Sequence, residues 1–419
     1  MVVVKSLSLA LLGLLAVLPT GQAHPGEEHN HAAIRREVKH LQTFASRSTK
    51  LLEKCSNNPS ARALRERALS RRLATAQSLQ GARSINAPVL HRRDLASLQA
   101  FEEVDHNATG SINYSDPSSI FSANTSCILA PEVTIGPYYV LGELVRQDLT
   151  DGRAGVPLHL EMQFIDVNTC KPVEDLLVDI WSCNATGTYS GVTSEGTLNE
   201  TFLRGLQQSS SDGVVEFDTL FPGHYQGRAT HEHLAVHTGT TLLPNGSFSG
   251  GEFSHIGQLF FEETLIDAVE ATSPYSTNDA PRTTNDEDMI AQSQADNNND
   301  PFMQYIYLDA DDITAGLLGW IEIGIDTSAN HSSSASWASY LAEDGGHENP
   351  NSGMGGGPGG PDGPGGSGGP GGPPSGGIPG SSTASAIASG TSSAIVSVYS
   401  SGAGQVHGLW RRFDGARRH

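Results

Sequence analysis

The stretch Gly-His-Tyr-Gln-Gly-Arg-Ala-Thr-His-Glu-His, residues 223–233, concentrates chemically active side chains. It contains Tyr225, Arg228, His231 and His233 within nine residues. His231 and His233 are two residues apart, so on a β-strand both imidazoles project from the same face. Two imidazoles on a rigid strand, with a phenol a few residues before them, predict a metal site.

Short segments in which apolar and polar residues alternate occur on both sides of this stretch, separated by turn-forming residues. They are Leu158–Asp166, Leu177–Trp181, Gly213–Phe217, His233–His237 and Gln258–Phe261. Alternation of this kind is typical of β-strands, and one helix is expected around Leu265–Ala271. Residues 106–328 are therefore predicted to form a mainly β domain, an antiparallel β-sandwich with long loops. Ser273–Pro301 is predicted to be an exposed loop, and Met303–Asp326 to close the sandwich.

The first 23 residues resemble a secretory signal peptide. Lys5 provides the positive charge, Leu7–Leu18 is apolar, and small residues favour cleavage after Ala23. The chain also has seven Asn-x-Ser/Thr glycosylation sites: Asn107, Asn113, Asn124, Asn184, Asn199, Asn245 and Asn330. Together these features predict a secreted protein, either extracellular or associated with the cell wall.

Two further regions flank the predicted domain. Residues 24–105 show helical patterning from about Ala32 to Ser78, with an apolar stripe at Leu41, Phe44, Leu51 and Leu52. This region is either a helical arm packed on the domain or a propeptide cleaved after the dibasic pair Arg92-Arg93. Residues 329–419 are rich in Gly, Pro and Ser, and are predicted to be a low-complexity, disordered tail.

The charge balance argues against two classes of partner. The formal net charge is −21 at pH 7. Between residues 102 and 350 there are six basic residues: Arg146, Arg153, Lys171, Arg204, Arg228 and Arg282. Because so acidic a surface repels nucleic acid and anionic membranes, we expect neither as a partner.

Four cysteines remain after removal of the signal peptide: Cys55, Cys127, Cys170 and Cys183. In an oxidising compartment an even number predicts two disulfides, with three alternative connectivities. The cysteines lack the paired short spacing of a zinc site, which favours a structural role.

A second tyrosine lies upstream in residues 178–190, where an apolar strand ending in Ile-Trp leads into a turn with Tyr189. Two motifs follow this turn in the chain: a Pro-Gly-His-Tyr turn ending at Tyr225, and the Arg-x-x-His-x-His run of residues 228–233. The order of these three motifs resembles that of the intradiol ring-cleavage dioxygenases, and specifically a secreted fungal-type subgroup of that family. The resemblance covers residues 126–325. It implies four ligands to a non-haem ferric ion: Tyr189, Tyr225, His231 and His233.

Two further segments carry the resemblance. Pro137 lies in a Gly-Pro-Tyr segment, so Pro137 and Tyr138 would line the substrate pocket, and Gln258 stands where the family has a glutamine near the substrate. Ala229 departs from the family's usual proline, and the spacing from Tyr225 to His231 is shorter than in the bacterial enzymes. The N-terminal region has no clear match to the helical dimerisation segment of the catechol-specific branch. These departures leave the substrate and the oligomeric state open, with a homodimer as one option.

The resemblance implies an enzyme that uses O₂ to cleave a catechol between its two hydroxylated carbons, giving a cis,cis-muconate. Tyr225 would be the ligand displaced by substrate, and Arg228 would stabilise negative charge on the substrate. The donor set suits ferric iron, a hard ion that anionic oxygen holds well, while histidines add neutral nitrogen. Few basic residues are available to pair a substrate carboxylate, which disfavours protocatechuate over catechol, hydroxyquinol and larger plant-derived diols.

Two alternatives belong to other classes. A secreted β-sandwich module could bind phenolic or polysaccharide material without turnover. Cleavage after Ala23 would instead expose His24 as the first residue of the mature chain, near His29 and His31, in the manner of a copper-dependent oxidase. The residues after His24 lead into a helical segment rather than a sandwich strand, which favours an incidental role for His24.

Overall fold

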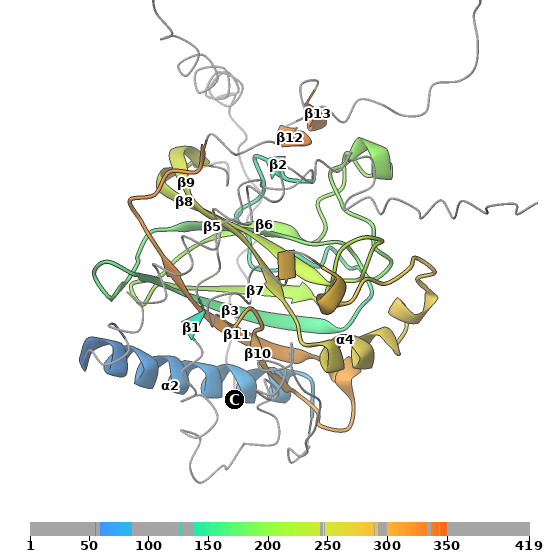
Figure 1. Ribbon diagram of the computed structural model, residues 1–419, viewed down its shortest axis with the longest axis horizontal. Coiled ribbons are helices and arrows are strands. Elements are labelled where there is room, and N and C mark those ends of the chain that lie inside the picture. The colour runs from blue at the N-terminus through green and yellow to red at the C-terminus, as the bar shows by residue number, and fades with distance from the viewer. Residues whose placement is uncertain are drawn as a thin grey trace, which may run out of the picture.

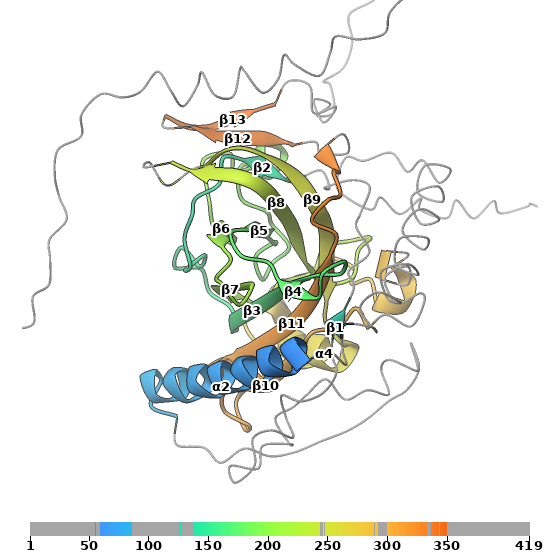
Figure 2. The same cartoon turned by 90° about the vertical axis from the view of Figure 1, so that its left-hand side faces the viewer.

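A computed structural model describes residues 55, 59–85, 126–127, 138–243, 246, 248–288, 290–291, 300–332, 337–342 and 344–349 of the 419 in the chain. Two β-sheets pack face to face, a helix covers one outer side, and a small third sheet covers the other (Figures 1 and 2). The described part is therefore mainly β, as the strand pattern predicts.

The four-stranded sheet holds the strand that carries both predicted histidine ligands. Its order is β6-β5-β8-β9, and all its neighbouring strands are antiparallel. The strands are β5 (Leu177–Trp181), β6 (Arg204–Gln208), β8 (His231–Leu242) and β9 (Phe248–Phe260). Alternation along β8 places Leu234 and Val236 in the core between the sheets. His231 and His233, two residues apart, share its opposite face.

The six-stranded sheet forms the other half of the sandwich. Its strands are β1 (Ser126–Cys127), β3 (Pro157–Asp166), β4 (Lys171–Pro172), β7 (Val214–Leu220), β10 (Gln304–Tyr307) and β11 (Leu317–Ile325). β3 pairs with β7 antiparallel but with β11 parallel, from Leu158↔Leu317 to Asp166↔Ile325. The antiparallel prediction therefore fails for this pair. The two strands are far apart in sequence, so no hairpin sets their relative direction.

The third sheet lies in the region predicted to be tail. β12 (Ser339–Ala342) pairs with β13 (Gly345–Glu348) and, in parallel, with β2 (Val140–Leu141). In Figure 2 it lies above the four-stranded sheet. The ordered domain thus extends past residue 328, to residue 348. The Gly/Pro-rich segment after residue 350 lies outside the described residues.

Helix α2 (Pro59–Ala82) runs beneath the six-stranded sheet (Figure 1). Its buried residues recur at helical spacing: Ala61, Leu64, Ala68, Arg72 and Ala76. Mostly small residues on this stripe allow the helix to approach the sheet closely. A helix is therefore present in this region and packs on the sheet. Removal of the region after Arg93 stays a prediction, and the expected stripe at residues 41–52 lies outside the described residues.

An ion cluster joins this helix to the sheet. Glu161 of β3 is buried, and its carboxylate accepts hydrogen bonds from Arg72 Nε (2.6 Å) and Arg71 Nε (2.8 Å). Burial alone would raise the pKa of Glu161, but the two guanidiniums outweigh it and hold the pKa below its ordinary value.

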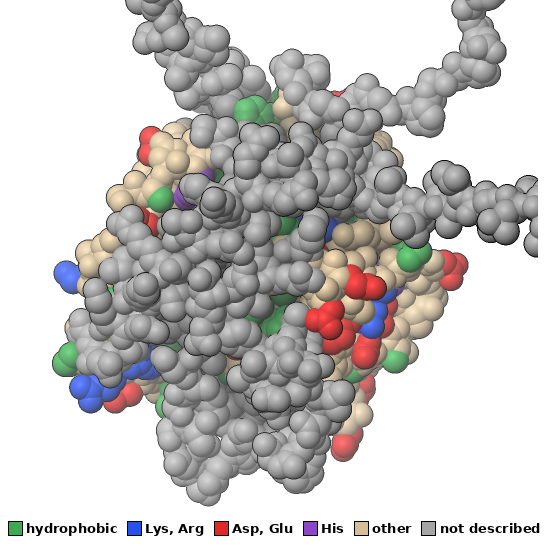
Figure 3. All heavy atoms as spheres, in the orientation of Figure 1, with side chains coloured by type: hydrophobic (Ala, Val, Ile, Leu, Met, Phe, Trp, Pro, Cys, Tyr) green, Lys and Arg blue, Asp and Glu red, His purple; other side chains and the backbone are tan. Residues whose placement is uncertain are grey.

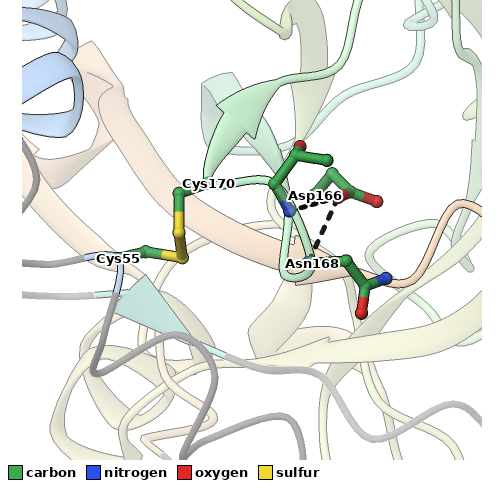
Figure 4. Close-up of a disulfide and its surroundings, with 5 residues drawn as sticks. Cys55, Asp166, Asn168 and Cys170 are labelled. Atoms are coloured by element: carbon green, nitrogen blue, oxygen red, sulfur yellow. Dashed lines mark hydrogen bonds between the residues drawn. A yellow bond between two sulfur atoms is a disulfide. The ribbon is translucent and has the colours of Figure 1, made fainter.

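A disulfide between Cys55 and Cys170 fastens the same arm to the domain (Figure 4). Cys170 ends a turn in which Asp166 Oδ1 accepts from the backbone N–H groups of Asn168 and Thr169. The prediction that Cys183 is disulfide-bonded is wrong: it is a buried free thiol that donates to the carbonyl of Gly223 at 3.2 Å. The side chain of Cys127 lies outside the described residues.

The remaining helical elements lie in the connections between strands. α4 (Glu263–Glu270) follows β9 and confirms the expected helix, while four 3-10 turns cover Thr193–Glu195, Tyr275–Thr277, Asn285–Glu287 and Ile313–Ala315. Within the described residues, no helix is both long and apolar enough to cross a membrane. The described surface in Figure 3 has acidic side chains gathered at the right and basic ones mainly at the lower left.

Candidate metal centre

Four donor atoms meet on the outer face of the four-stranded sheet. The hydroxyl of Tyr225 lies 3.3 Å from Nε2 of His231, and this Nε2 lies 3.0 Å from Nε2 of His233. Nε2 of His233 lies 3.1 Å from the hydroxyl of Tyr189. All four side chains are buried. The structure thus brings together all four predicted ligands, two phenols and two imidazoles.

The sheet orients both histidines. In the register, His233 lies opposite Trp181 of β5 and Gln258 of β9. The indole of Trp181 stacks on the His233 ring, with centroids 4.8 Å apart and planes 3° from parallel. Nδ1 of His231 donates to the carbonyl of Ala229 at 2.6 Å. The lone pair of His231 Nε2 therefore faces the other donors, as a metal ligand requires.

The two tyrosines come from turns whose backbones pack together. A Cβ at Gly187 would lie 2.4 Å from the carbonyl oxygen of His224, and one at Gly223 would lie 2.3 Å from that of Asn184. Gly187 also has a positive φ of 84°. Only glycine permits so close an approach, which sets the spacing between Tyr189 and Tyr225.

Arg204 and Thr197 hold the main chain around Tyr189. Nη2 of the buried Arg204 donates to the carbonyl of Ser190 at 2.7 Å, and the guanidinium carbon lies 5.9 Å from the centre of the Tyr189 ring. Thr197 Oγ1 donates to the Tyr189 carbonyl at 2.6 Å. Tyr138 stacks on Tyr189 with centroids 4.7 Å apart, which places this predicted pocket residue beside the site.

Burial governs protonation in the cluster. Desolvation and then the positive charge of Arg228 lower the pKa of His231 to about 3, so its imidazole is neutral. Desolvation raises the pKa of both Tyr189 and Tyr225 above the ordinary value, and the neighbouring Tyr225 raises that of Tyr189 further. The charge of Arg228 opposes this rise without cancelling it, so two phenols this deeply buried stay protonated when no metal ion binds them. A trivalent metal ion reverses that preference.

Arg228 lies next to this cluster and is held on two sides. Its Nε donates to Asp288 Oδ2 at 2.9 Å, and its Nη2 donates to Gln258 Oε1. Asp288 is buried, which by itself would raise its pKa, but the charge of Arg228 holds the pKa below its ordinary value. The structure thus places Arg228 and Gln258 together, and adds Asp288, which sequence reasoning missed.

Asp288 belongs to residues 275–288, which we call the strap. The strap follows residues 221–229 in order, through four bonds: Tyr275 Oη to Phe221 O (2.6 Å), Asn278 Nδ2 to His224 O (2.7 Å), Gly227 N to Thr283 Oγ1 (3.0 Å) and Ala229 N to Asp288 Oδ2 (2.7 Å). The prediction of an exposed loop is therefore wrong at Tyr275, Asn285 and Asp288, which are buried, while residues such as Asp279 and Asp286 are exposed as predicted. The side chains of Asn278, Asn285 and Asp288 bind neighbouring backbone groups.

Within the described residues, no group of three or more His, Cys, Asp or Glu side chains is placed to hold a metal ion. Pro137 and His24, predicted for the substrate pocket and for an alternative copper site, lie outside the described residues. Among the glycosylation candidates, Asn199 and Asn330 are exposed and Asn184 is half-buried.

Comparison with known proteins identifies the family. The family model described as "Dioxygenase" matches residues 135–304. An intradiol ring-cleavage dioxygenase from Tetranychus urticae is 30% identical over 49% of this chain and 98% of its own, with a TM-score of 0.41. The chain belongs to the intradiol ring-cleavage dioxygenases. A second solved dioxygenase is also 30% identical, over 50% of this chain and 99% of that one, with a TM-score of 0.42. No curated protein matches the chain significantly.

Family membership makes the protein an oxidoreductase that cleaves an aromatic ring with dioxygen, and confirms the predicted reaction class. The family model begins before Tyr138 and includes Tyr189, Arg228, both histidines and Asp288. α2 lies outside this match. The catalytic fold and the arm beneath it are thus separate parts of the chain in sequence, joined by the Cys55–Cys170 bond.

Proposed function

We propose that this intradiol dioxygenase is a secreted enzyme that holds ferric iron with Tyr189, Tyr225, His231 and His233. Its substrate is a catechol-type diol without a ring carboxylate, and its product is a cis,cis-muconate-type acid. The observation that carries the proposal is the run of 3.0–3.3 Å contacts that joins the four donor atoms. Two phenolates and two neutral imidazoles match the preference of a hard trivalent ion.

When bound, ferric iron supplies Lewis acidity that activates a catecholate toward dioxygen. The chain's own residues supply orientation and charge. Tyr189 is held at its carbonyl by Thr197 and at the next carbonyl by Arg204, so its hydroxyl keeps a constant position. Tyr225 provides the second phenol, the ligand that the substrate would displace. Burial excludes water and strengthens every electrostatic interaction in the site.

Arg228 stabilises negative charge that develops on the substrate. Asp288 and Gln258 orient its guanidinium, so that little reorganisation is needed as the charge appears. Its buried position makes its field stronger than that of a surface arginine.

The distribution of cations supports a substrate without a carboxylate. The two cations beside the cluster, Arg228 and Arg204, already pair with Asp288 and with Glu143. A carboxylated catechol would bring a further negative charge into a buried site and would need a cation of its own. Catechol, hydroxyquinol and larger carboxylate-free diols fit this site better than protocatechuate.

Oxygen uptake by the iron-loaded protein tests this function. We expect uptake with catechol or another carboxylate-free diol, with a cis,cis-muconate formed in equal amount. Preference for protocatechuate would overturn the substrate class. Cleavage of the ring bond next to the pair of hydroxylated carbons, instead of the bond between them, would overturn the proposed reaction. The absence of oxygen uptake with any diol would overturn it as well.

Secretion is supported by the Cys55–Cys170 disulfide, because such bonds persist in oxidising compartments. The apolar segment and small residues before position 24 are the second support. Expression in a eukaryotic host should deliver the protein to the medium with a new N-terminus at His24 or after Arg93. Retention inside the cell with an intact N-terminus would contradict it. A homodimer stays a prediction.

A further inference from the structure

His224 immediately precedes Tyr225, and both of its ring nitrogens are engaged. Nδ1 lies 2.7 Å from Oε1 of Glu270, at the end of α4, and Nε2 lies 2.8 Å from the carbonyl oxygen of Ala280 in the strap. A carbonyl only accepts hydrogen bonds, so Nε2–H is the donor to Ala280. The side chain is 5% exposed. The imidazole therefore ties the tyrosine turn to two other segments.

The main chain of His224 is fixed as well. Its carbonyl accepts from Asn278 Nδ2 at 2.7 Å. The same oxygen packs against Gly187, where a Cβ would approach to 2.4 Å. His224 is thus held by α4, by the strap and by the turn that carries Tyr189.

This clamp lies one residue from a side chain that has to move in the proposed reaction. Because these contacts hold the main chain at residue 224, the backbone of the turn does not move as a whole. The phenol of Tyr225 then reaches or leaves the other donor atoms by rotating about its own side-chain bonds. Partners of this kind, outside the ligand set, orient ligands and tune metal affinity.

We propose that His224 is a positioning residue that clamps the Tyr225 turn to Glu270 and Ala280, so that Tyr225 exchanges by side-chain rotation on a fixed backbone. The inference rests on the proposed ferric site for its consequence in catalysis. The clamp itself depends only on contacts within the chain.

The first test compares His224→Ala with His159→Ala in the full-length, metal-free protein. His159 is a matched control: it is 5% exposed, and its Nδ1 lies 2.7 Å from Asp218, but it lies in β3 of the other sheet. We expect faster hydrogen–deuterium exchange of the amides of residues 223–229 in His224→Ala only. Unchanged exchange there would overturn the clamp.

The second test loads both variants with ferric ion. We expect His224→Ala to weaken ferric affinity or to lower kcat/KM by roughly 10- to 100-fold, as for other partners that orient ligands. Its phenolate-to-iron absorption band should also shift, while His159→Ala keeps the wild-type band. A wild-type band and affinity in a folded His224→Ala protein would overturn the positioning role.

Glu270→Gln keeps the size of the side chain and guards against loss of the fold. We expect hydrogen–deuterium exchange and the phenolate-to-iron band of this variant to change in the same direction as in His224→Ala, but by less. Wild-type behaviour of this variant in both measurements would overturn the part assigned to Glu270. Failure of the wild-type protein to bind iron would instead overturn the proposed function, and the exchange measurement would still decide on the clamp.

Discussion

Arg228 and Asp288 form a buried ion pair, with Nε 2.9 Å from Oδ2, between the segment just before strand β8 and the strap. Both side chains are at most 5% exposed. The same Oδ2 also accepts from the backbone N–H of Ala229 at 2.7 Å. One carboxylate therefore holds both the side chain of Arg228 and the main chain just before His231.

Asp288→Asn removes the negative charge while preserving the shape of the side chain. We expect a loss of roughly 3 kcal/mol in the free energy of unfolding, because a buried guanidinium loses its partner. Urea unfolding checks this. Asp267→Asn is the matched control, since Asp267 pairs with Arg282 at 2.6 Å but its side chain is 63% exposed, and its loss should stay below about 1 kcal/mol. Equal losses in the two variants would contradict the buried pairing.

Tyr189→Phe removes one proposed phenolate and keeps the ring. We expect the ferric protein to lose or shift its visible phenolate band and to lose oxygen uptake. Tyr139→Phe is the control: Tyr139 is buried in the same aromatic cluster, and its hydroxyl is not among the four meeting donor atoms. Its band should match the wild type. Full activity in Tyr189→Phe would refute the assignment of this ligand.

The Glu161 cluster predicts how stability depends on pH. The pKa of Glu161 is lower in the folded protein than its ordinary value of about 4.3. Its contribution to stability is therefore complete above the unfolded pKa and is lost as pH falls through the folded pKa. Glu161→Gln should be less stable than wild type by roughly 3–5 kcal/mol at pH 7. That difference should narrow in urea unfolding below about pH 4, and a constant difference down to pH 2 would contradict the prediction.

The Cys55–Cys170 bond predicts how the arm behaves after cleavage. Cys170→Ser should lower the free energy of unfolding by roughly 2–4 kcal/mol, because the unfolded chain gains freedom. Cleavage after Arg93 should leave the arm attached on a non-reducing gel and release it under reducing conditions. Release without reductant would show that the purified protein lacks this bond.

The sequence predicts that Tyr225, His231 and His233 lie together because these residues are close in the chain. His231 and His233 share a face as soon as they lie on one strand, and Tyr225 and Arg228 are only a few residues away. Tyr189 required the order of motifs found in the family. The bounds of β5 follow from its short apolar run, and those of β3 are only one residue wider than predicted.

Other features depend on contacts between distant segments. Alternation tells which face of β3 packs in the apolar core between the sheets, but not that β11 is its parallel neighbour. The strap reads as a polar loop because Asn, Asp and Thr favour water and backbone partners alike. Asp288 and His224 acquire their roles only when that segment folds against residues 221–229. The number of cysteines is compatible with a Cys55–Cys170 disulfide but does not distinguish it from the other possible pairings. It also gives no sign that Cys183 is a free thiol.

The visible absorption spectrum of the full-length protein loaded with one equivalent of ferric ion tests the central claim most directly. Two tyrosines and two histidines around the ion should give a burgundy-red protein with a phenolate-to-iron band, which changes when catechol is added without oxygen. A colourless protein that nevertheless holds one ferric ion, or a protein that takes up none, would contradict the proposed ligand set.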